Sequence, residues 1–332
     1  MPLVAERVLV TGAAGFIGSH LSRRLVAEGF EVVGLDDLSD GSLDNLRDVT
    51  EVRFVEADLR DEAAVTQAAA GCTTIFHQGA KRAVPRSMAF PVETTDVNVG
   101  GMLNVLLAAR EEDATVVAAS SSSVYGDQEV FPLDESMELR PRSPYAASKV
   151  TGEVYAGSFW RSQGVRSVSL RYFNVYGPGQ DPENEYAAVV PRFVVACLTK
   201  QAPVIFGDGE QARDFTFIED VVEANLGASR AAEAAWGRAF NVGGGEPPTS
   251  VNELLRRIAE LTEAKPEPRF EPMRAGDVRL TEADISLARD LLGFQPRVPI
   301  AEGLRRTVES FRQPGRQPGR QAEADVAVRS GT

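Results

Sequence analysis

The feature that most constrains the fold is a glycine-rich segment between an apolar run and a helical one. Arg7–Thr11 (RVLVT) is typical of a short buried strand, Gly12-Ala-Ala-Gly15-Phe-Ile-Gly18 follows it directly, and apolar residues then recur at helical spacing from Phe16 to Glu28. Glycine permits a tight turn with close backbone approach, and a helix N-terminus offers free N–H groups to a phosphate. The order strand, loop, helix therefore predicts a phosphate-binding turn, the alternative being a tight turn without a ligand.

Strand-like and helix-like segments alternate for about 170 residues after this turn. The predicted strands are continuously apolar, which is typical of a parallel sheet covered by helices on both faces. The predicted strands are 7–11, 32–35, 52–55, 73–77, 115–119 and 167–171, and the predicted helices are 16–28, 61–70, 92–110 and 146–161. The fold class is therefore α/β, a doubly wound parallel sheet of the Rossmann type.

The pattern changes after Gly177, where a polar loop (GPGQDPENEY) precedes shorter elements. Helices are predicted at 191–198, 251–261 and 285–292, and buried strands at 204–206, 215–218 and 239–242. We expect a Rossmann domain of residues 1–175 plus 213–243 and a smaller substrate-binding lobe of 176–212 plus 244–312. The repeat RQPGRQPGRQ predicts that residues 313–332 form a disordered tail.

The charge balance and the rare residues exclude several functions. Asp plus Glu total 48 against 35 Lys plus Arg, a net charge of −13 that disfavours nucleic acid or an anionic membrane as a partner. Two cysteines (Cys72, Cys197) and two histidines (His20, His77) leave little for a metal site or a Ser-His-Asp hydrolase. No apolar run approaches the ~20 residues that span a bilayer, and no secretory signal begins the chain. We therefore expect a cytoplasmic protein without a metal.

Carboxylates follow the second and third predicted strands. Asp36 stands 18 residues after Gly18, where an acidic side chain accepts hydrogen bonds from the adenosine ribose hydroxyls of a dinucleotide. Asp36 would repel the 2′-phosphate of NADP, Asp37 adds to that repulsion, and no arginine stands between residues 31 and 46. NAD is therefore the predicted cofactor. Asp58 is expected either at the adenine amino group or as a carboxylate at a helix N-terminus.

The most specific pattern is a serine run (120–123) after a buried strand, followed by Tyr145-Ala-Ala-Ser-Lys149. Residues four apart share one helix face, so the Lys149 ammonium is expected to lower the pKa of the Tyr145 phenol from ~10 towards neutrality. A serine hydroxyl at the strand end would share a hydrogen bond with a reacting alcohol. The alternative is a surface pair of an aromatic and a cation.

With these motifs the sequence resembles the extended short-chain dehydrogenase/reductases that act on nucleotide sugars, over roughly residues 5–312. It is most similar to the UDP-sugar 4-epimerases, and within them to those that interconvert UDP-N-acetylglucosamine and UDP-N-acetylgalactosamine. The matching segments are TGAAGFIGSHL, HQGAKRAVPRS, ASSSSVYGD, SPYAASK, LRYFNVYGPGQDP, YAAVVPRF, GDGEQARDF and RAGDVR. The resemblance implies NAD as cofactor, a UDP-sugar as substrate and a homodimer formed through a four-helix interface of 92–110 and 146–161.

The resemblance also implies roles for individual residues. Tyr145 would take the proton of the sugar 4-hydroxyl while C4 is oxidised, Lys149 would support Tyr145 and the nicotinamide ribose, and Ser121 would be the third catalytic residue. The implied NAD contacts are Gly12, Gly15, Phe16, Ile17, Gly18, Asp36, Asp37, Leu38, Ser39, Asp58, Leu59, Gln78, Gly79, Ala80, Asn98, Ser120, Tyr145, Lys149 and Tyr172. The implied substrate contacts are Ser122, Ser123, Asn174, Asn184, Ala188, Val190, Phe206, Arg213, Arg274, Asp277 and Thr281.

Within this second group, Asn174 would bind sugar and diphosphate, Arg213 and Arg274 the diphosphate, and Asp277 a ribose hydroxyl. Arginine suits a diphosphate because its planar fork matches phosphate oxygens, although an ordinary surface salt bridge is the alternative for both arginines. Asn184, Ala188, Val190 and Phe206 lie in the stretch that binds uridine in the resembling enzymes.

A few positions favour one reaction within the family. Dehydratases carry an Asp-Glu pair after the catalytic Ser/Thr, whereas this chain has Ser122 and Ser123, which do not titrate near neutral pH. Thr281 stands where strict glucose/galactose epimerases have tyrosine, and a smaller side chain leaves room for a 2-acetamido group. Lys81 and Arg82 depart from the resembling subgroup, and because their loop is expected to face the sugar, they suit an acidic one. UDP-glucuronate 4-epimerisation or decarboxylation therefore stays open, as does a non-catalytic NAD-binding regulator.

Overall fold

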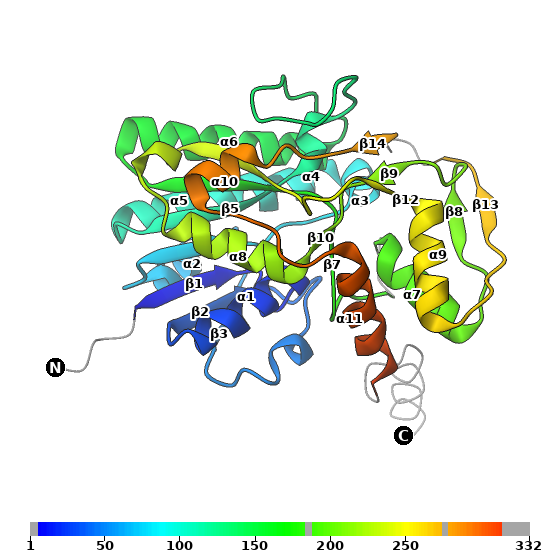
Figure 1. Ribbon diagram of the computed structural model, residues 1–332. Helices are drawn as coiled ribbons and strands as arrows, with labels where there is room; N and C mark the ends of the chain where they lie inside the picture. The colour runs from blue at the N-terminus through cyan, green and yellow to red at the C-terminus, as the bar shows by residue number, and fades with distance from the viewer. Residues whose placement is uncertain (1–5, 183–187, 274–277, 314–332) are drawn as a thin grey trace.

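The computed structural model describes residues 6–182, 188–273 and 278–313, and its centre is a seven-stranded sheet in which every pair of neighbours is parallel (Figure 1). The strand order is β11-β6-β5-β4-β1-β2-β3. The strands are β1 (Arg7–Thr11), β2 (Glu31–Asp36), β3 (Arg53–Glu56), β4 (Thr74–His77), β5 (Thr115–Ser121), β6 (Ser167–Tyr172) and β11 (Arg238–Val242). The order reverses between β1 and β4, which is where doubly wound sheets bind ligands, and the predicted Rossmann-type sheet is confirmed.

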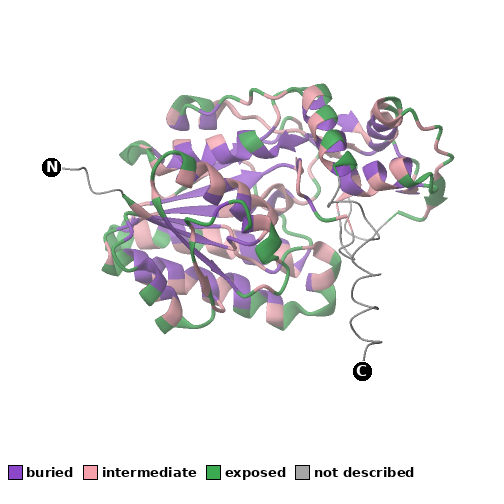
Figure 2. Ribbon diagram, turned by 90° about the horizontal axis from the view of Figure 1, so that it is seen from below, coloured by how far each residue is buried: buried purple, intermediate pink, exposed green. Residues whose placement is uncertain are grey.

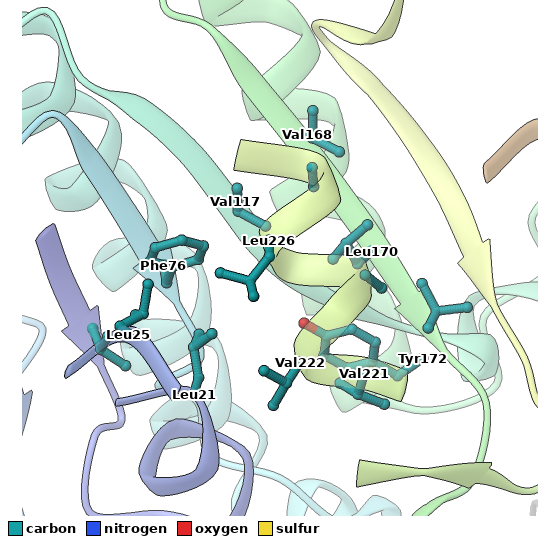
Figure 3. Close-up of a cluster of buried hydrophobic side chains, with 14 of the residues drawn as sticks. Leu21, Leu25, Phe76, Val117, Val168, Leu170, Tyr172, Val221, Val222 and Leu226 are labelled. Atoms are coloured by element: carbon teal, nitrogen blue, oxygen red, sulfur yellow. The ribbon is translucent and has the colours of Figure 1, made fainter. Parts of the chain in front are cut away.

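Helices cover both faces of this sheet, and the strands between them are buried (Figure 2). One face carries α2 (Glu62–Ala69), α5 (Gly101–Glu111) and α6 (Pro144–Gln163). The other carries α1 (Phe16–Ala27), α8 (Ile218–Ser229) and α10 (Ser286–Leu292). In Figure 3, Leu226 of α8 lies near Val117 of β5 and Leu170 of β6. Because burying such side chains is the main favourable term in folding, these two clusters fix the sheet that presents the site.

The helix that carries Tyr145 and Lys149 has well-defined ends. Ser143 is its N-cap, and its hydroxyl oxygen accepts a hydrogen bond from the Ala146 N–H at 3.1 Å. Pro144 occupies the first position, where its missing N–H costs nothing. Gly164 ends α6 in the left-handed conformation (φ +74°). The start of α6 is therefore fixed within one turn of Tyr145.

The predicted single helix of residues 92–110 has an irregular start. Helix α3 (Val84–Ala89) and helix α4 (Pro91–Thr95) come first, and a π-helical turn (Asp96–Gly100) then leads into α5. Such π turns are frequent at functional sites. This one carries Asn98, whose amide hydrogen-bonds both backbone groups of Lys81.

The smaller lobe lies to one side of the sheet (Figure 1). Its elements are α7 (Val189–Thr199), α9 (Val251–Thr262), α11 (Ile300–Arg312), the pair β8 (Val204–Phe206) and β13 (Arg269–Glu271), and the three strands β12 (Thr249–Ser250), β9 (Ala212–Arg213) and β14 (Leu280–Thr281). Short strands β7 (Val175–Tyr176) and β10 (Thr216–Phe217) connect it to the main sheet. The domain boundaries given above stay a prediction. Helix α10, although late in the chain, packs with the core of the main sheet.

One predicted strand is shorter than expected. Within residues 215–218 only Thr216 and Phe217 form a buried strand, β10, which pairs with β7, and Ile218 already begins α8. Glu219 and Asp220 in the first turn of α8 favour a helix start there. The predicted disordered tail lies outside the described residues except for Gln313. Within the described ranges, no helix is both long and apolar enough to cross a membrane.

Candidate active site

A cavity of about 280 Å³ opens at the carboxyl ends of β1, β2 and β4. The glycine loop forms its floor: Gly12 has φ +68°, and a Cβ there would lie 2.7 Å from the Gly79 Cα. A Cβ on Gly18 would collide with the Gly12 carbonyl, so both positions require glycine. No side chain caps the N-terminus of α1, which leaves its first N–H groups for an anion. A cradle closed by backbone in this way fits the pyrophosphate of a dinucleotide.

The carboxylates expected to recognise the ribose stand at the rim of this cavity. Asp36 is buried, and its two oxygens accept hydrogen bonds from the Ala14 N–H at 3.0 Å and the Leu38 N–H at 2.8 Å. Burial raises the pKa of Asp36, and these two backbone N–H groups partly offset that rise. Asp37 faces the same cavity but is ion-paired to Lys81 at 3.3 Å. Lys81 thus offsets part of the Asp37 charge, and the contribution of Asp37 to repelling a 2′-phosphate stays a prediction.

Asp58 does not cap the N-terminus of α2, one of the two roles expected for it. Its carboxylate is paired with the guanidinium of Arg60 at 2.5 Å, and Asp61 instead caps the N-terminus of α2. Its neighbours Ala57 and Leu59 line the cavity. Contact between Asp58 and adenine stays a prediction.

Ser121, Tyr145 and Lys149 converge at the end of β5. Tyr145 is hydrogen-bonded to the Ser121 hydroxyl. The Ser123 hydroxyl donates to the Ser121 oxygen at 2.9 Å. The Lys149 ammonium donates to the Ala119 carbonyl at 2.7 Å and lies 5.9 Å from the centre of the Tyr145 ring. The three side chains that the motif singled out are therefore neighbours in space.

The electrostatics of Tyr145 depend first on its burial. Burial raises the pKa of Tyr145, and the hydrogen bond to Ser121 and the charge of Arg82 oppose this rise. The Lys149 ammonium is directed at the Ala119 carbonyl rather than at the Tyr145 hydroxyl. Burial also lowers the pKa of Lys149 to about 8, against the opposing charge of Glu153. The expected effect of Lys149 and the nicotinamide on the Tyr145 pKa stays a prediction.

A second cavity of about 420 Å³ adjoins these residues and lies between the main sheet and the strands of the smaller lobe. Its walls include Ser120, Ser121, Ser122, Ser123, Tyr145, Tyr172, Asn174, Arg213 and Thr281. The Asn174 amide donates to the Thr281 hydroxyl at 3.1 Å, which joins the end of β6 to β14. Most of the predicted substrate residues described by the structure are thus brought together.

Other predicted residues lie around this centre. The Tyr172 hydroxyl hydrogen-bonds Gln78 at 3.1 Å, which joins the two cavities. Asn98 is buried beneath the Lys81 backbone and also bonds Ser148. Ser120 donates to Glu153. Phe16, Ile17, Ser39, Gly79 and Ala80 line the first cavity with the glycine loop.

The residues predicted to bind uridine do not converge on the second cavity as the other predicted substrate residues do. Val190 is buried in the hydrophobic core of the smaller lobe, Ala188 precedes α7, and the Arg192 guanidinium lies 5.7 Å from the Phe206 ring centre. None of these three predicted residues lines the second cavity among the described residues. Asn184, Arg274 and Asp277 lie outside the described residues.

Lys81 contradicts the expectation that its charge faces the sugar. It lines the first cavity and its ammonium contacts Asp37 and Ser39. Arg82 also lines the first cavity, whereas Ala83 and Val84 line the second. The loop therefore spans both cavities, with its cations on the dinucleotide side.

Some lining residues had no sequence signal. Gln180 and Asp40 line the first cavity, and Arg142 and Val278 line the second. They lie in loops without periodicity, so only the tertiary fold brings them to the site. Among the described residues, no group of His, Cys, Asp or Glu is arranged to hold a metal ion.

Known proteins resemble this chain over nearly its whole length. A protein of Mycolicibacterium smegmatis named UDP-glucose 4-epimerase is 44% identical, with 92% of this chain and 98% of the relative covered. One of Thermodesulfobacterium geofontis named UDP-glucuronate 4-epimerase is 32% identical, with 90% and 94% covered.

Among solved structures, the UDP-N-acetylglucosamine 4-epimerase of Methanobrevibacter ruminantium, in complex with UDP-N-acetylmuramic acid, has a TM-score of 0.88 at 36% identity and covers 93% of this chain and 99% of its own. The model of the NAD dependent epimerase/dehydratase family matches residues 8–243. This protein therefore belongs to the NAD-dependent epimerase/dehydratase family and uses NAD as its cofactor.

Proposed function

We propose that this protein is a UDP-sugar 4-epimerase that interconverts UDP-N-acetylglucosamine and UDP-N-acetylgalactosamine and also accepts UDP-glucose and UDP-galactose. The observation that carries the proposal is the second cavity, which is lined by Tyr145, Ser121 and the small side chain of Thr281. The whole-length relatives named as UDP-sugar 4-epimerases support the reaction class.

The chain's own residues supply the proton chemistry. Tyr145 accepts the proton of the sugar 4-hydroxyl, and Ser121, already hydrogen-bonded to Tyr145, shares the bond to that oxygen. Bound NAD supplies the group that accepts the C4 hydride and returns it to the other face of the sugar. Asp36 and the glycine loop would hold the adenosine diphosphate part, and Lys149 and Ser121 lie beside Tyr145 for its nicotinamide end. Arg213 lines the second cavity, where its guanidinium suits the diphosphate of the substrate.

Thr281 supports the N-acetyl specificity. It is 8% exposed and its hydroxyl is held by the Asn174 amide at 3.1 Å, so its side chain has a defined position in the wall. A tyrosine at this position would fill part of the cavity in which the sugar turns between its two orientations. The 2-acetamido group is the largest substituent that must pass in that turn.

Dehydration fits the cavity less well. Elimination of water across C5 and C6 needs an acid and a base at the sugar, and the residues that follow Ser121 are Ser122 and Ser123, whose hydroxyls do not titrate near neutral pH. The Ser123 hydroxyl already donates a hydrogen bond to the Ser121 hydroxyl. Epimerisation needs no further titrating group.

UDP-glucuronate is the second candidate substrate. Arg142 lines the second cavity and could pair with a sugar carboxylate, although it is 2.6 Å from Asp127. Against this candidate, Lys81 is directed at Asp37 rather than at the sugar. A measurement on all three sugars separates the candidates.

The test compares substrates and one wall residue. Proton NMR of separate incubations with UDP-N-acetylglucosamine, UDP-glucose and UDP-glucuronate should show the 4-epimers of the first two. Thr281→Tyr should reduce turnover of UDP-N-acetylglucosamine at least about tenfold more than that of UDP-glucose, in the range that a steric clash in a pocket produces. Thr281→Ser keeps the hydroxyl and the small volume, and should leave the ratio unchanged. An equal loss of turnover on both sugars in Thr281→Tyr would refute the role of Thr281. Turnover of UDP-glucuronate alone would refute the proposal that UDP-N-acetylglucosamine and UDP-glucose are the substrates.

We also propose a homodimer. Exposed apolar side chains gather on the segments around α3, α4 and α6, namely Met88, Phe90, Val92 and Val154, with exposures of 56% to 71%. Helices α3 and α4 both pack beside α6. A contiguous apolar surface on neighbouring helices is typical of a subunit interface, and a second copy of this chain would cover it with the same helices.

A further inference from the structure

Two ion pairs connect the loops on opposite sides of the first cavity. The Lys81 ammonium is 3.3 Å from an Asp37 oxygen and also contacts the Ser39 hydroxyl. The Arg86 guanidinium is 3.1 Å and 3.2 Å from the two oxygens of Asp40. The acidic partners follow β2 and the basic partners follow β4, so both pairs join the same two segments. We call these two pairs the clasp.

The clasp belongs to the wall of the dinucleotide cavity. Asp37, Ser39, Asp40 and Lys81 all line it. The Lys81 side chain is 6% exposed and that of Asp37 32%, whereas those of Arg86 and Asp40 are 24% and 23% exposed. Lys81 is therefore the most buried group of the clasp, and we call its pair the inner contact and the Arg86 pair the outer one. Shielding from water strengthens such contacts relative to ion pairs on an open surface.

One side of the clasp is fixed and the other is a loop. The Lys81 N–H donates to the Asn98 side-chain oxygen at 2.7 Å, and the Lys81 carbonyl accepts from the Asn98 amide at 3.1 Å. Asp37 and Asp40 stand in the segment between β2 and the turn at Leu43–Leu46. Opening the cavity on this side therefore requires the β2 loop to move away from Lys81.

The backbone near both residues of the inner pair is in an unfavourable conformation. Leu38, next to Asp37, has φ +56°, and Ala83, two residues after Lys81, has φ +80°. Residues other than glycine rarely adopt positive φ, and such positions persist where surrounding contacts hold them. The clasp supplies contacts of this kind on both segments.

We propose that the clasp retains NAD: the two ion pairs must open before the dinucleotide leaves, and their strength sets its dissociation rate. A 4-epimerisation returns NAD to its starting state in each cycle, so retention costs no turnover. The proposal rests on the NAD dependence of the family and not on which sugar the enzyme converts. It assigns Lys81, Asp37, Arg86 and Asp40 a role that is distinct from proton chemistry.

The test is the exchange of bound NAD. The purified holoenzyme is loaded with radiolabelled NAD and mixed with excess unlabelled NAD, and the label retained after rapid desalting is followed in time, without any sugar. Lys81→Met should accelerate exchange about tenfold and Arg86→Gln about threefold, as expected for an inner and an outer ion pair. Arg7→Gln is the matched control, because the Arg7–Glu31 pair joins β1 and β2 at the opposite end of the sheet. It should exchange at the wild-type rate.

Variants of the two acidic residues distinguish the clasp from a simpler explanation, in which Lys81 and Arg86 retain NAD only by attracting its phosphates. Asp37→Asn and Asp40→Asn remove negative charge near an anionic ligand, so attraction alone predicts slower exchange. The clasp predicts faster exchange for both. Arg86 also pairs with Glu93 at 3.6 Å. Asp40→Asn combined with Arg86→Gln should therefore be no faster than Arg86→Gln alone, because the Arg86–Asp40 contact is already lost in that variant.

These outcomes decide the proposal even if Lys81→Met does not fold. The outer pair is partly exposed, so its variants keep the fold, and their circular dichroism and melting temperature are checked against Arg7→Gln. The proposal that the clasp retains NAD would be overturned if Asp40→Asn and Arg86→Gln exchange NAD at the wild-type rate. Slower exchange of NAD in Asp37→Asn would also overturn it. Lack of activity on any UDP-sugar would refute the proposed function and leave this measurement intact.

Discussion

At the scale of single residues, the chemistry depends on how the environment of Tyr145 combines opposing effects. Burial disfavours the phenolate and raises the pKa of Tyr145, while the Ser121 hydrogen bond and the Arg82 charge favour the phenolate. A bound nicotinamide would add positive charge to the same region. We therefore expect the proton affinity of the phenol to depend on the bound cofactor as well as on the protein's own groups.

Tyr145→Phe removes the hydroxyl that accepts the sugar proton. We expect turnover to fall by about 10³-fold, within the range for loss of a general base, while NAD stays bound. Tyr155→Phe makes the same change on the same helix away from both main cavities, and should retain activity. The measurement is the steady-state rate together with the NAD content of each protein. Substantial activity in Tyr145→Phe would remove this residue as the base.

At the scale of secondary-structure elements, a buried ion pair holds α6 against β6. The Arg171 guanidinium bonds both oxygens of Glu153 at 2.9 Å and 2.7 Å, and the two side chains are 5% and 9% exposed. Arg171 also donates to the Tyr125 hydroxyl at 2.8 Å. Glu153 lies one turn after Lys149, so this pair fixes the helix that carries the catalytic residues.

Arg171→Met should therefore destabilise the protein strongly. It leaves the Glu153 carboxylate buried without its partner, which costs roughly 3–5 kcal/mol. Adding Glu153→Gln should recover much of this loss, because no buried charge then remains. The free energies of unfolding in denaturant measure both effects. A loss below about 1 kcal/mol in Arg171→Met would show that water reaches the pair.

Periodicity predicted the central sheet well because its strands are continuously apolar and its helices are amphipathic. The predicted 7–11 strand matches β1 at both ends, and the predicted 146–161 helix begins two residues late. Helices α8 and α11 were not predicted. The strand predicted at 215–218 extends too far, because so short an apolar run does not show where a strand ends and a helix starts. Strands of two residues, such as β9 and β14, are too short for any pattern.

The parts of the site that could be predicted from the sequence are those formed by residues of a short local motif. The glycine loop, the serine run and the Tyr145–Lys149 spacing are short patterns with a physical reason. The contact of Lys81 with Asp37 joins residues 44 apart in sequence, and no local pattern signals it. The same holds for Arg142 in the second cavity.

At the scale of the whole molecule, two cavities meet at the carboxyl ends of the central strands. Gln78 lines the first and Tyr172 the second, and their hydrogen bond joins the walls. Ile17 lines both. This arrangement gives a dinucleotide and a sugar nucleotide a shared boundary near Tyr145, which hydride transfer between them requires.

The proposed homodimer is tested at the same scale. Val154→Glu introduces a charge on the exposed apolar surface of α6, where Val154 is 61% exposed. We expect the variant to elute as a monomer in size-exclusion chromatography with light scattering, because an unpaired charge in an apolar interface is costly. Val130→Glu, at an exposed valine (67%) in the loop before α6, is the control and should stay dimeric. A monomeric wild type would contradict the interface.

The central claim is that the sugar is oxidised at C4 and reduced again without release of the hydride. UDP-N-acetylglucosamine deuterated at C4 is incubated with the purified protein, with no NAD added, and the product is analysed by NMR and mass spectrometry. We predict a 4-epimer that retains the deuterium at C4, because bound NAD holds it between the two steps. A 4-epimer that has exchanged the deuterium for solvent hydrogen would contradict the account.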